Sequence, residues 1–130
     1  MSDGRKSRVI VITGDGKGKT TSSLGMVVRA VGHGQRVCVI QFIKGRRDTG
    51  EVRALAQLPG VELHVCGEGF VFPGSDVPLE AHRRAADAGL ALAREKLCDP
   101  AFGLVVLDEV CGAVALGLVD AAAVCEAVAA

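Results

Sequence analysis

The chain has 130 residues, of which 49% are apolar and only 3% aromatic, with neither Trp nor Tyr. Fifteen basic and fifteen acidic side chains cancel, which excludes the strong overall field that draws a protein to nucleic acid or to an anionic membrane. The length suits one domain, residues 1–130, and no apolar run is long enough to cross a membrane. The five cysteines include no C-x-x-C pair, so we expect reduced thiols in a cytoplasmic protein.

Four short apolar runs alternate with helix-like stretches along the chain. The apolar runs are rich in β-branched residues and bounded by Gly, Pro or charge, which predicts strands over 8–13, 36–42, 61–65 and 102–108. The stretches between them predict helices over 20–34, 50–60 and 78–100. Asp120 can cap one further helix, the only one expected after the last strand.

The alternation of strand and helix predicts an α/β fold: a mostly parallel sheet with flanking helices, in three α/β/α layers. The run 61–65 alternates apolar and polar residues, which places it near an edge, whereas the other three are nearly continuous, as strands covered on both faces are. Ligands of such sheets bind beyond the carboxyl ends of the strands. That rule brings 14–20, 43–50 and the pair Asp108–Glu109 to one rim.

The segment TGDGKGKTT, residues 13–21, lies between the first predicted strand and the first predicted helix. Its glycines let successive backbone N–H groups turn toward an anion at the helix N-terminus. Its lysines supply mobile cations, and the loop is one residue shorter than the common G-x-x-x-x-G-K-[ST] pattern. We therefore predict an ATP-binding phosphate loop formed by Gly14, Asp15, Gly16, Lys17, Gly18, Lys19, Thr20 and Thr21.

An acidic pair ends the last predicted strand, in the segment LVVLDE. Asp108 and Glu109 stand where a phosphate-binding protein keeps its magnesium carboxylates, and the Thr20 hydroxyl is the third candidate ligand for Mg²⁺. A tight turn and a polar strand end would be the structural alternative. Three glycines and two lysines within residues 14–19 favour phosphate binding. His33, His64 and His82 lie far apart without a nearby cysteine pair, so spacing predicts no Cys/His metal cluster.

Several of these segments resemble the ATP:corrinoid adenosyltransferase family, whose phosphate loop has the shortened form G-x-G-K-G-K-T. The matching stretches are TGDGKGKTTSSLGMVVRAVGHG, VCVIQFIKGR, VELHVCGEGF and FGLVVLDEV, and the similarity runs from about residue 8 to the end. The resemblance implies a P-loop NTPase-like fold and transfer of the 5′-deoxyadenosyl group of ATP to the reduced cobalt of a corrinoid, with release of triphosphate. Because the cobalt is the nucleophile, no general acid, general base or side-chain nucleophile is assigned.

The resemblance also implies Mg²⁺ as cofactor, a homodimer and a flavoprotein as electron donor. Phe70 and Phe72 match the place where many members carry a Phe and a Trp facing the corrinoid, although this chain has Phe in place of the Trp. Lys44 stands in the segment QFIKG, residues 41–45, which ends the second strand at the same rim, so it could reach phosphate or corrinoid. The alternatives are an apolar patch under a loop for the two phenylalanines, and a solvated lysine before a turn.

The resemblance implies that family members continue through at least one more strand and rim loop beyond the acidic pair. The 130 residues are therefore expected to be a fragment, a C-terminally truncated gene product or a natural minimal form of such a protein. Two other functions therefore stay open: a catalytically incompetent module that binds Mg-ATP, and a small P-loop kinase or NTPase. The kinase would need an acceptor pocket, and no arginine-rich lid segment stands near the C-terminus. Formation of triphosphate, rather than of ADP, would distinguish the adenosyltransferase from the kinase.

Overall fold

The computed structural model describes residues 18–42, 50–66 and 79–129 of the chain, with the backbone alone for residues 19–20, 51–52 and 79. The predicted strand at 8–13 lies outside the described residues. The described elements, in order, are α1 (Lys19–Gly32), β1 (Arg36–Gln41), α2 (Gly50–Ala56), β2 (Val61–Val65), α3 (Leu79–Leu97), β3 (Phe102–Asp108), α4 (Val110–Ala115) and α5 (Ala121–Ala129). None of the helices in this part of the chain is long and apolar enough to span a bilayer.

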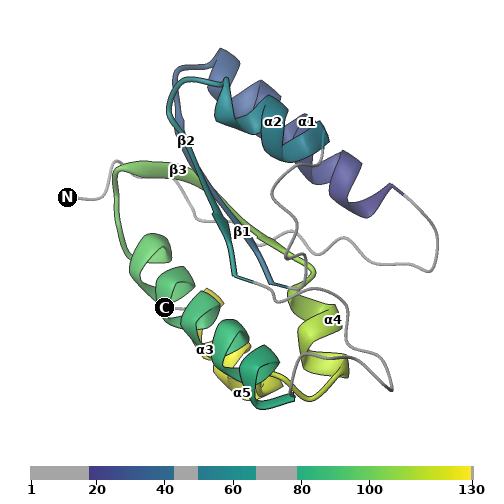
Figure 1. The fold of residues 1–130 in the computed structure, drawn as a ribbon. Coiled ribbons are helices and arrows are strands. Elements are labelled where there is room, and N and C mark those ends of the chain that lie inside the picture. The colour runs from purple at the N-terminus through teal and green to yellow at the C-terminus, as the bar shows by residue number, and fades with distance from the viewer. Residues whose placement is uncertain (1–17, 43–49, 67–78, 130) are drawn as a thin grey trace.

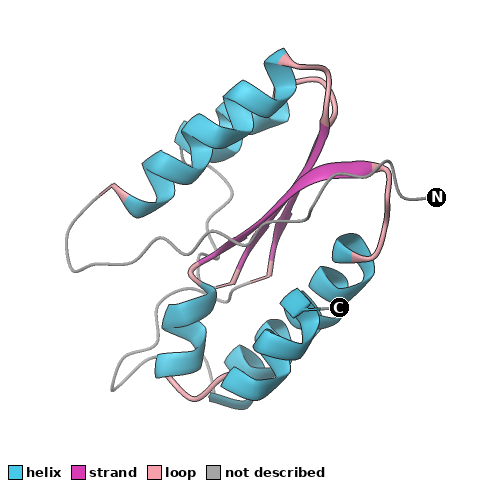
Figure 2. Cartoon of the chain, turned by 180° about the vertical axis from the view of Figure 1, so that it is seen from behind, coloured by secondary structure: helices cyan, strands magenta, loops and turns pink. Residues whose placement is uncertain are grey.

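The three described strands form one sheet in the order β2-β1-β3, and both pairings are parallel. Helices α1 and α2 cover one face of the sheet, and α3, α4 and α5 lie on the other side (Figure 1). The view from behind shows the same three layers (Figure 2). The predicted α/β class with a parallel sheet and flanking helices is therefore confirmed, and the sheet is consistent with a P-loop NTPase-like fold.

The predicted strands match the structure closely: β2 and β3 have the predicted bounds, and β1 ends one residue earlier, at Gln41. The prediction of a single helix after β3 is wrong, because two short helices, α4 and α5, follow it. Helix α4 has only six residues, too few for an apolar period to be recognised. Gly117, with a φ of 74°, follows α4 and allows the chain to turn toward α5.

Side chains of the central strand alternate between two apolar clusters. Cys38 and Ile40 belong to the cluster under α3 and α5, whereas Val37 and Val39 belong to the cluster under α1 and α2. All residues of β1 after Arg36 are buried, as its continuous apolar run predicts. Strand β2 is half-buried throughout and is an edge strand of the described sheet, in agreement with its alternating sequence. Most of β3 is only half-buried, which differs from the prediction of a strand covered on both faces.

Helix α3 approaches the sheet most closely at Gly89. A Cβ atom at this position would lie 3.1 Å from Cε1 of Phe42 and 3.3 Å from Cβ of Cys66. Phe42 is almost fully buried, so it has little room to move away. The absence of a side chain at Gly89 therefore sets the distance between α3 and the carboxyl end of β1.

Alanine substitutions at two helical glycines should separate helix propensity from packing. Gly25→Ala in α1, where a Cβ would meet nothing within 4 Å, should stabilise the protein by about 0.5–1 kcal/mol, a rise in Tm of about 3–5 °C. Gly89→Ala gains the same propensity but presses on Phe42, so no rise is expected, and Gly89→Leu should lower Tm. Thermal unfolding measures all three, and an equal rise for both alanine variants would contradict the close approach.

Candidate functional site

The carboxyl ends of the three described strands are held level by backbone hydrogen bonds. The Phe42 amide donates to the Asp108 carbonyl at 3.0 Å, and the Cys66 amide donates to the Gln41 carbonyl at 2.8 Å. Gln41 is the register partner of Val65 on one side and of Asp108 on the other. Polar groups that end these strands are thereby gathered at one edge of the sheet.

Two buried polar side chains, Gln41 and Asp108, stand at this edge, with 1% and 8% of their surface exposed. They are register partners in a parallel pair, so they share a face of the sheet. Side chains two residues apart in a strand also share a face, so Val39 and Val106 lie on the same face as Gln41 and Asp108. Those two valines pack in the α1 cluster. Gln41 and Asp108 therefore belong to the face that α1 covers.

Helix α1 brings its N-terminus toward the same edge. It has 14 residues, about 21 Å, and the six residues of β1 span about 20 Å. Since α1 packs on the sheet and turns directly into the start of β1, its first turn lies on the side of the strand's carboxyl end. The N-terminus of a helix carries unpaired N–H groups and a partial positive charge, which attract anions.

Gly18 is the N-cap of α1 and has a φ of 111°, a conformation that side chains other than glycine rarely adopt. Its carbonyl accepts a hydrogen bond from the Ser22 amide at 2.8 Å, which starts the helix. Gly18 is exposed, and a Cβ there would meet nothing within 4 Å. The glycine is thus required by the backbone conformation and not by crowding.

Glu109 is the one non-glycine residue with a positive φ in the described part of the chain, at 65°. It is the N-cap of α4, and its carbonyl accepts a hydrogen bond from the Ala113 amide at 3.0 Å. A left-handed conformation costs an L residue about 1–2 kcal/mol, and such strain is concentrated at functional sites. The chain therefore turns sharply away directly after Asp108, at the edge of the sheet.

The structure thus places three parts of the predicted site at the same end of the sheet: Gly18 with the start of α1 at Lys19, Asp108, and Glu109. Thr21 lies in the first turn of α1 and is exposed. For Lys19 and Thr20 only the backbone is described. The remaining predicted site residues lie outside the described residues, and they are Gly14, Asp15, Gly16, Lys17, Lys44, Phe70 and Phe72.

Two buried polar residues were not predicted from the sequence. Gln41 Oε1 and His82 Nε2 are buried and make no hydrogen bond in the described structure. Gln41 stands in the motif QFIKG, and its position at the end of an apolar strand is the signal that could have singled it out. His82 follows the apolar spacing of α3 together with Ala86, so the sequence offers no signal that separates it from a core residue.

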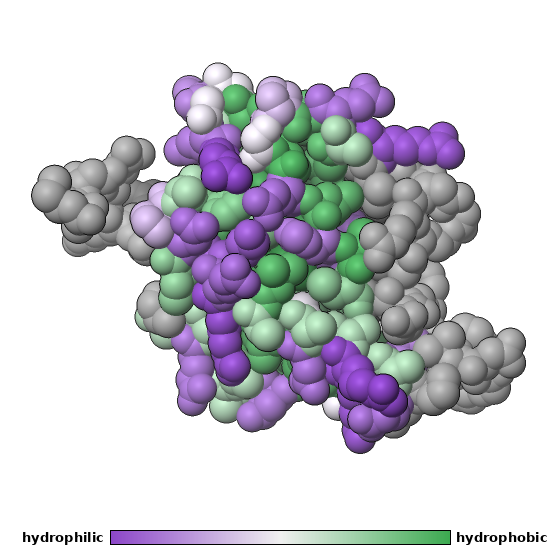
Figure 3. Space-filling model, turned by 60° about the vertical axis from the view of Figure 1, so that its left-hand side comes forward, coloured by the Kyte–Doolittle hydropathy of each residue, from purple (hydrophilic) through white to green (hydrophobic). Residues whose placement is uncertain are grey.

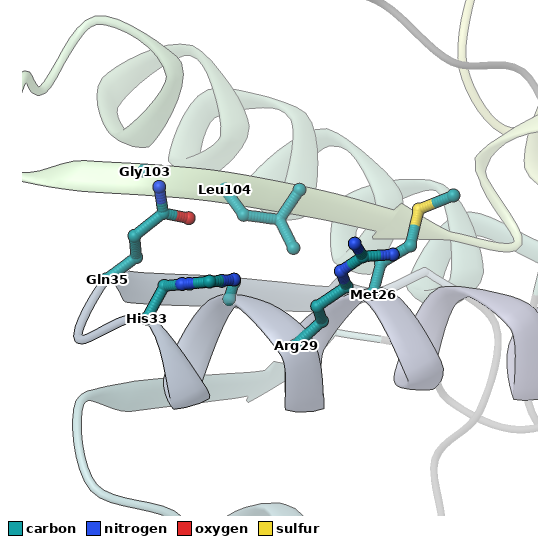
Figure 4. Close-up of a pocket in the computed structure, with 7 residues that line it drawn as sticks. Met26, Arg29, His33, Gln35, Gly103 and Leu104 are labelled. Atoms are coloured by element: carbon teal, nitrogen blue, oxygen red, sulfur yellow. The ribbon is translucent and has the colours of Figure 1, made fainter.

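A cavity of about 260 Å³ lies at the opposite end of the sheet. It is bounded by the second half of α1 and the beginning of β3. Leu104 lies in the middle of the lining, with Gln35 and His33 at one end and Arg29 and Met26 at the other (Figure 4). Gly103 and Leu104 are near the amino end of β3, far along the strand from Asp108. This cavity is therefore separate from the carboxyl edge.

The surface shows no single large apolar area in the view of Figure 3, where apolar and hydrophilic side chains are interspersed. Among the described residues, the large apolar side chains that are exposed are Met26, Val28 and Leu116. Scattered residues of this kind are normal for a folded protein. The described residues in this view therefore do not indicate an apolar docking surface.

A parallel sheet with helices on both faces, with a helix N-terminus and a buried carboxylate at its carboxyl edge, is typical of the α/β class of proteins that bind their ligands at that edge. The sequence profile of ATP:corrinoid adenosyltransferase BtuR/CobO/CobP matches residues 5–130. The chain belongs to this ATP:corrinoid adenosyltransferase family.

Individual relatives agree with the family match. A corrinoid adenosyltransferase of Pseudomonas aeruginosa is 46% identical over 102 residues, which cover 78% of this chain and 49% of the relative. Corrinoid adenosyltransferase CobA of Salmonella typhimurium is 44% identical over 106 residues, covering 78% and 50%. A corrinoid adenosyltransferase of a Sinorhizobium species is 36% identical over 126 residues, covering 92% and 56%. The chain thus spans about half the length of these relatives.

Relief of the backbone strain at Glu109 should be measurable as stability. Glu109→Gly should raise the free energy of unfolding by about 1 kcal/mol or less, because glycine adopts a positive φ without the Cβ clash but loses more entropy on folding. Glu109→Ala keeps the Cβ and should bring no such gain. Chemical denaturation of the two variants tests this, and equal stabilities would show that the left-handed conformation costs nothing here.

Proposed function

We propose that this chain carries the nucleotide-binding part of an enzyme that transfers the 5′-deoxyadenosyl group of ATP to the reduced cobalt of a corrinoid. The family match over residues 5–130 carries this proposal. The arrangement of Asp108 and the start of α1 at the carboxyl edge supports it, because that edge is where sheets of this class bind nucleotides. In this proposal residues 1–130 form a single P-loop domain.

The phosphate loop would stabilise the leaving group. In the reaction, the cobalt electron pair forms a bond to C5′ of ATP while the bond from C5′ to the phosphate oxygen breaks, and triphosphate departs with that electron pair. Negative charge grows on the triphosphate as the bond lengthens. Backbone N–H groups of 15–19, the Lys19 and Lys17 ammonium groups and the N-terminus of α1 would favour this charge, with Gly14, Gly16, Gly18 and Thr21 shaping the loop.

Mg²⁺ is the cofactor that this proposal requires, and the described residues fit it. Asp108 is a carboxylate at the carboxyl edge on the α1 face, and the buried Gln41 oxygen beside it makes no hydrogen bond in the described structure. A water molecule on the ion could satisfy that oxygen. Asp108, Thr20 and Glu109 would hold the ion, which when bound neutralises part of the triphosphate charge.

The corrinoid would be bound by segments that the structure does not describe. Phe70 and Phe72 are proposed to face the corrinoid, and Lys44 to reach either its side chains or the triphosphate. The homodimer, the flavoprotein electron donor and the cytoplasmic location are part of the same proposal, and they follow from the family resemblance.

Removal of the phosphate-loop lysine should abolish turnover. The purified chain is incubated without oxygen with chemically reduced corrinoid, Mg²⁺ and ATP, and the cobalt–carbon chromophore and triphosphate are measured together. Lys19→Ala should lower the rate at least about 100-fold, the usual cost of losing one donor to a developing oxyanion. The matched control is Arg94→Ala, an exposed cation in the last turn of α3, which should leave the rate unchanged.

The outcomes separate the competing functions. Both products in the wild-type protein and a normal rate in a folded Lys19→Ala variant would remove the phosphate loop from the mechanism. ADP in place of triphosphate would identify a kinase or NTPase. ATP binding to a folded protein without either product would identify a nucleotide-binding module that lacks the rest of the enzyme.

Asp108→Asn tests whether the Asp108 carboxylate is a ligand of Mg²⁺. The substitution keeps the size of the buried side chain and removes its charge, so we expect the affinity for Mg-ATP to fall by at least about tenfold while affinity for ATP without Mg²⁺ changes little. Isothermal calorimetry with and without Mg²⁺ measures both. An equal loss in the two conditions would mean that Asp108 acts on the fold or on the nucleotide directly.

A further inference from the structure

Three metal-binding side chains converge on the opposite face of the sheet from Asp108. Cys38 comes from β1, and Glu62 and His64 come from β2. One thiol, carboxylate or imidazole ligand atom from each lies within 4.8 Å of the other two. Cys38 is the register partner of Glu62, and His64 follows two residues later on the same face.

The chemistry of the three groups suits one class of ion. Thiolate, imidazole and carboxylate together are ligands of Zn²⁺, at about 2.0–2.3 Å from the metal. Ligand atoms at those distances stand roughly 3–4 Å apart around a tetrahedral ion, so small side-chain movements would complete the geometry. Hard cations such as Mg²⁺ prefer oxygen ligands and are not suited to this set.

The three residues are buried to different degrees, so an ion can reach them from the solvent side. Cys38 is fully buried, whereas the side chains of Glu62 and His64 are 32% and 34% exposed. The thiol therefore lies at the bottom of the cluster, and the other two ligands stand between it and solvent. A fourth position on the solvent side can be taken by water. Burial raises the pKa of the Cys38 thiol to about 11, so the thiol is protonated until a cation binds beside it.

Two protein cations already contact the carboxylate of Glu62, and Arg36 Nη2 lies 3.4 Å from its Oε2. Lys96 Nζ lies 3.1 Å from Oε1 of Glu62, the same oxygen that His64 Nε2 contacts at 3.1 Å. The hydrogen bonds from His64 and Lys96 hold the pKa of Glu62 below its usual value. Lys96 has a second contact available, because its ammonium also lies 5.1 Å from the centre of the Phe102 ring. It can leave the carboxylate and remain over the ring.

We propose that Cys38, Glu62 and His64 bind a divalent transition-metal ion of the Zn²⁺ class, with water as the fourth ligand. Binding displaces the thiol proton to solvent and the Lys96 ammonium from the Glu62 carboxylate. Cys38 precedes Gln41 by three residues, about 10 Å along β1, and it faces α3. The ion is therefore separate from the Mg²⁺ proposed at the carboxyl edge, and it joins β1 to the edge strand β2.

Titration of the full chain with Co²⁺ tests the site, since a thiolate bound to tetrahedral Co²⁺ absorbs characteristically. We expect one Co²⁺ per chain with thiolate-to-metal absorption that Zn²⁺ removes. Cys38→Ala should lose this absorption, whereas the matched control Cys111→Ala, an exposed cysteine on α4, should keep it. Absorption that persists in folded Cys38→Ala, or that disappears in Cys111→Ala, would overturn the proposal in favour of the exposed thiols.

Two further variants keep the test decisive if Cys38→Ala does not fold. His64→Gln changes a partly exposed ligand and should weaken Co²⁺ binding by more than about tenfold, since even second-shell changes cost that much. Lys96→Met removes the cation that shares Oε1 of Glu62 with His64 and should tighten binding by at least about twofold. Unchanged affinity in His64→Gln would show that the cluster is an ion-pair network only.

Discussion

The parallel pairing of β1 with both of its neighbours is the constraint on which the rest of the molecule depends. Its register fixes the face and the level of every side chain in the sheet, because side chains alternate and partners share a face. A shift by one residue would turn Cys38 toward α1 and Gln41 toward α3. Both apolar clusters would then lose the side chains that β1 contributes to them. The carboxyl edge would lose Gln41, and the cluster of Cys38, Glu62 and His64 would lose Cys38.

The two faces of the sheet carry different chemistry as a result. At the carboxyl edge, the α1 face holds Asp108 beside Gln41, with the N-terminus of α1 on the same side. Nearer the amino end, the α3 face holds the Cys38, Glu62 and His64 cluster. Oxygen ligands and a helix N-terminus suit a magnesium-bound phosphate, whereas sulfur and nitrogen ligands suit a softer ion. The sheet between them keeps the two sites apart.

Two residues at the carboxyl edge, where the chain changes direction, have an unusual backbone conformation. Gly18 and Glu109 both have a positive φ, and each is the residue directly before a helix. Residue 18 is a glycine, which adopts a positive φ readily, whereas residue 109 is a glutamate, for which the same conformation is costly. An acidic side chain in a strained position fits a role for that side chain in binding.

The relation to the corrinoid adenosyltransferases connects the start of α1 and the acidic end of β3 to one proposed function. The chain spans about half of the length of the relatives and includes the strand that ends at Asp108 and the helix that starts at Lys19. In the proposed function, those elements hold the triphosphate and its metal. The relatives' remaining length is where further parts of the whole enzyme would lie.

The sequence by itself determined the α/β class and the bounds of β2 and β3, because short β-branched runs bounded by Gly, Pro or charge have few other structures available. It also placed Asp108 at the ligand edge, since that edge follows from strand direction alone. It missed α4, whose six residues carry no measurable period. It also missed the metal-binding cluster, because Cys38 and Glu62 are 24 positions apart and only the register of β1 with β2 makes them neighbours. Tertiary structure decided such contacts between strands, since hydrophobic periodicity reports which face a residue takes and not which distant residue stands beside it.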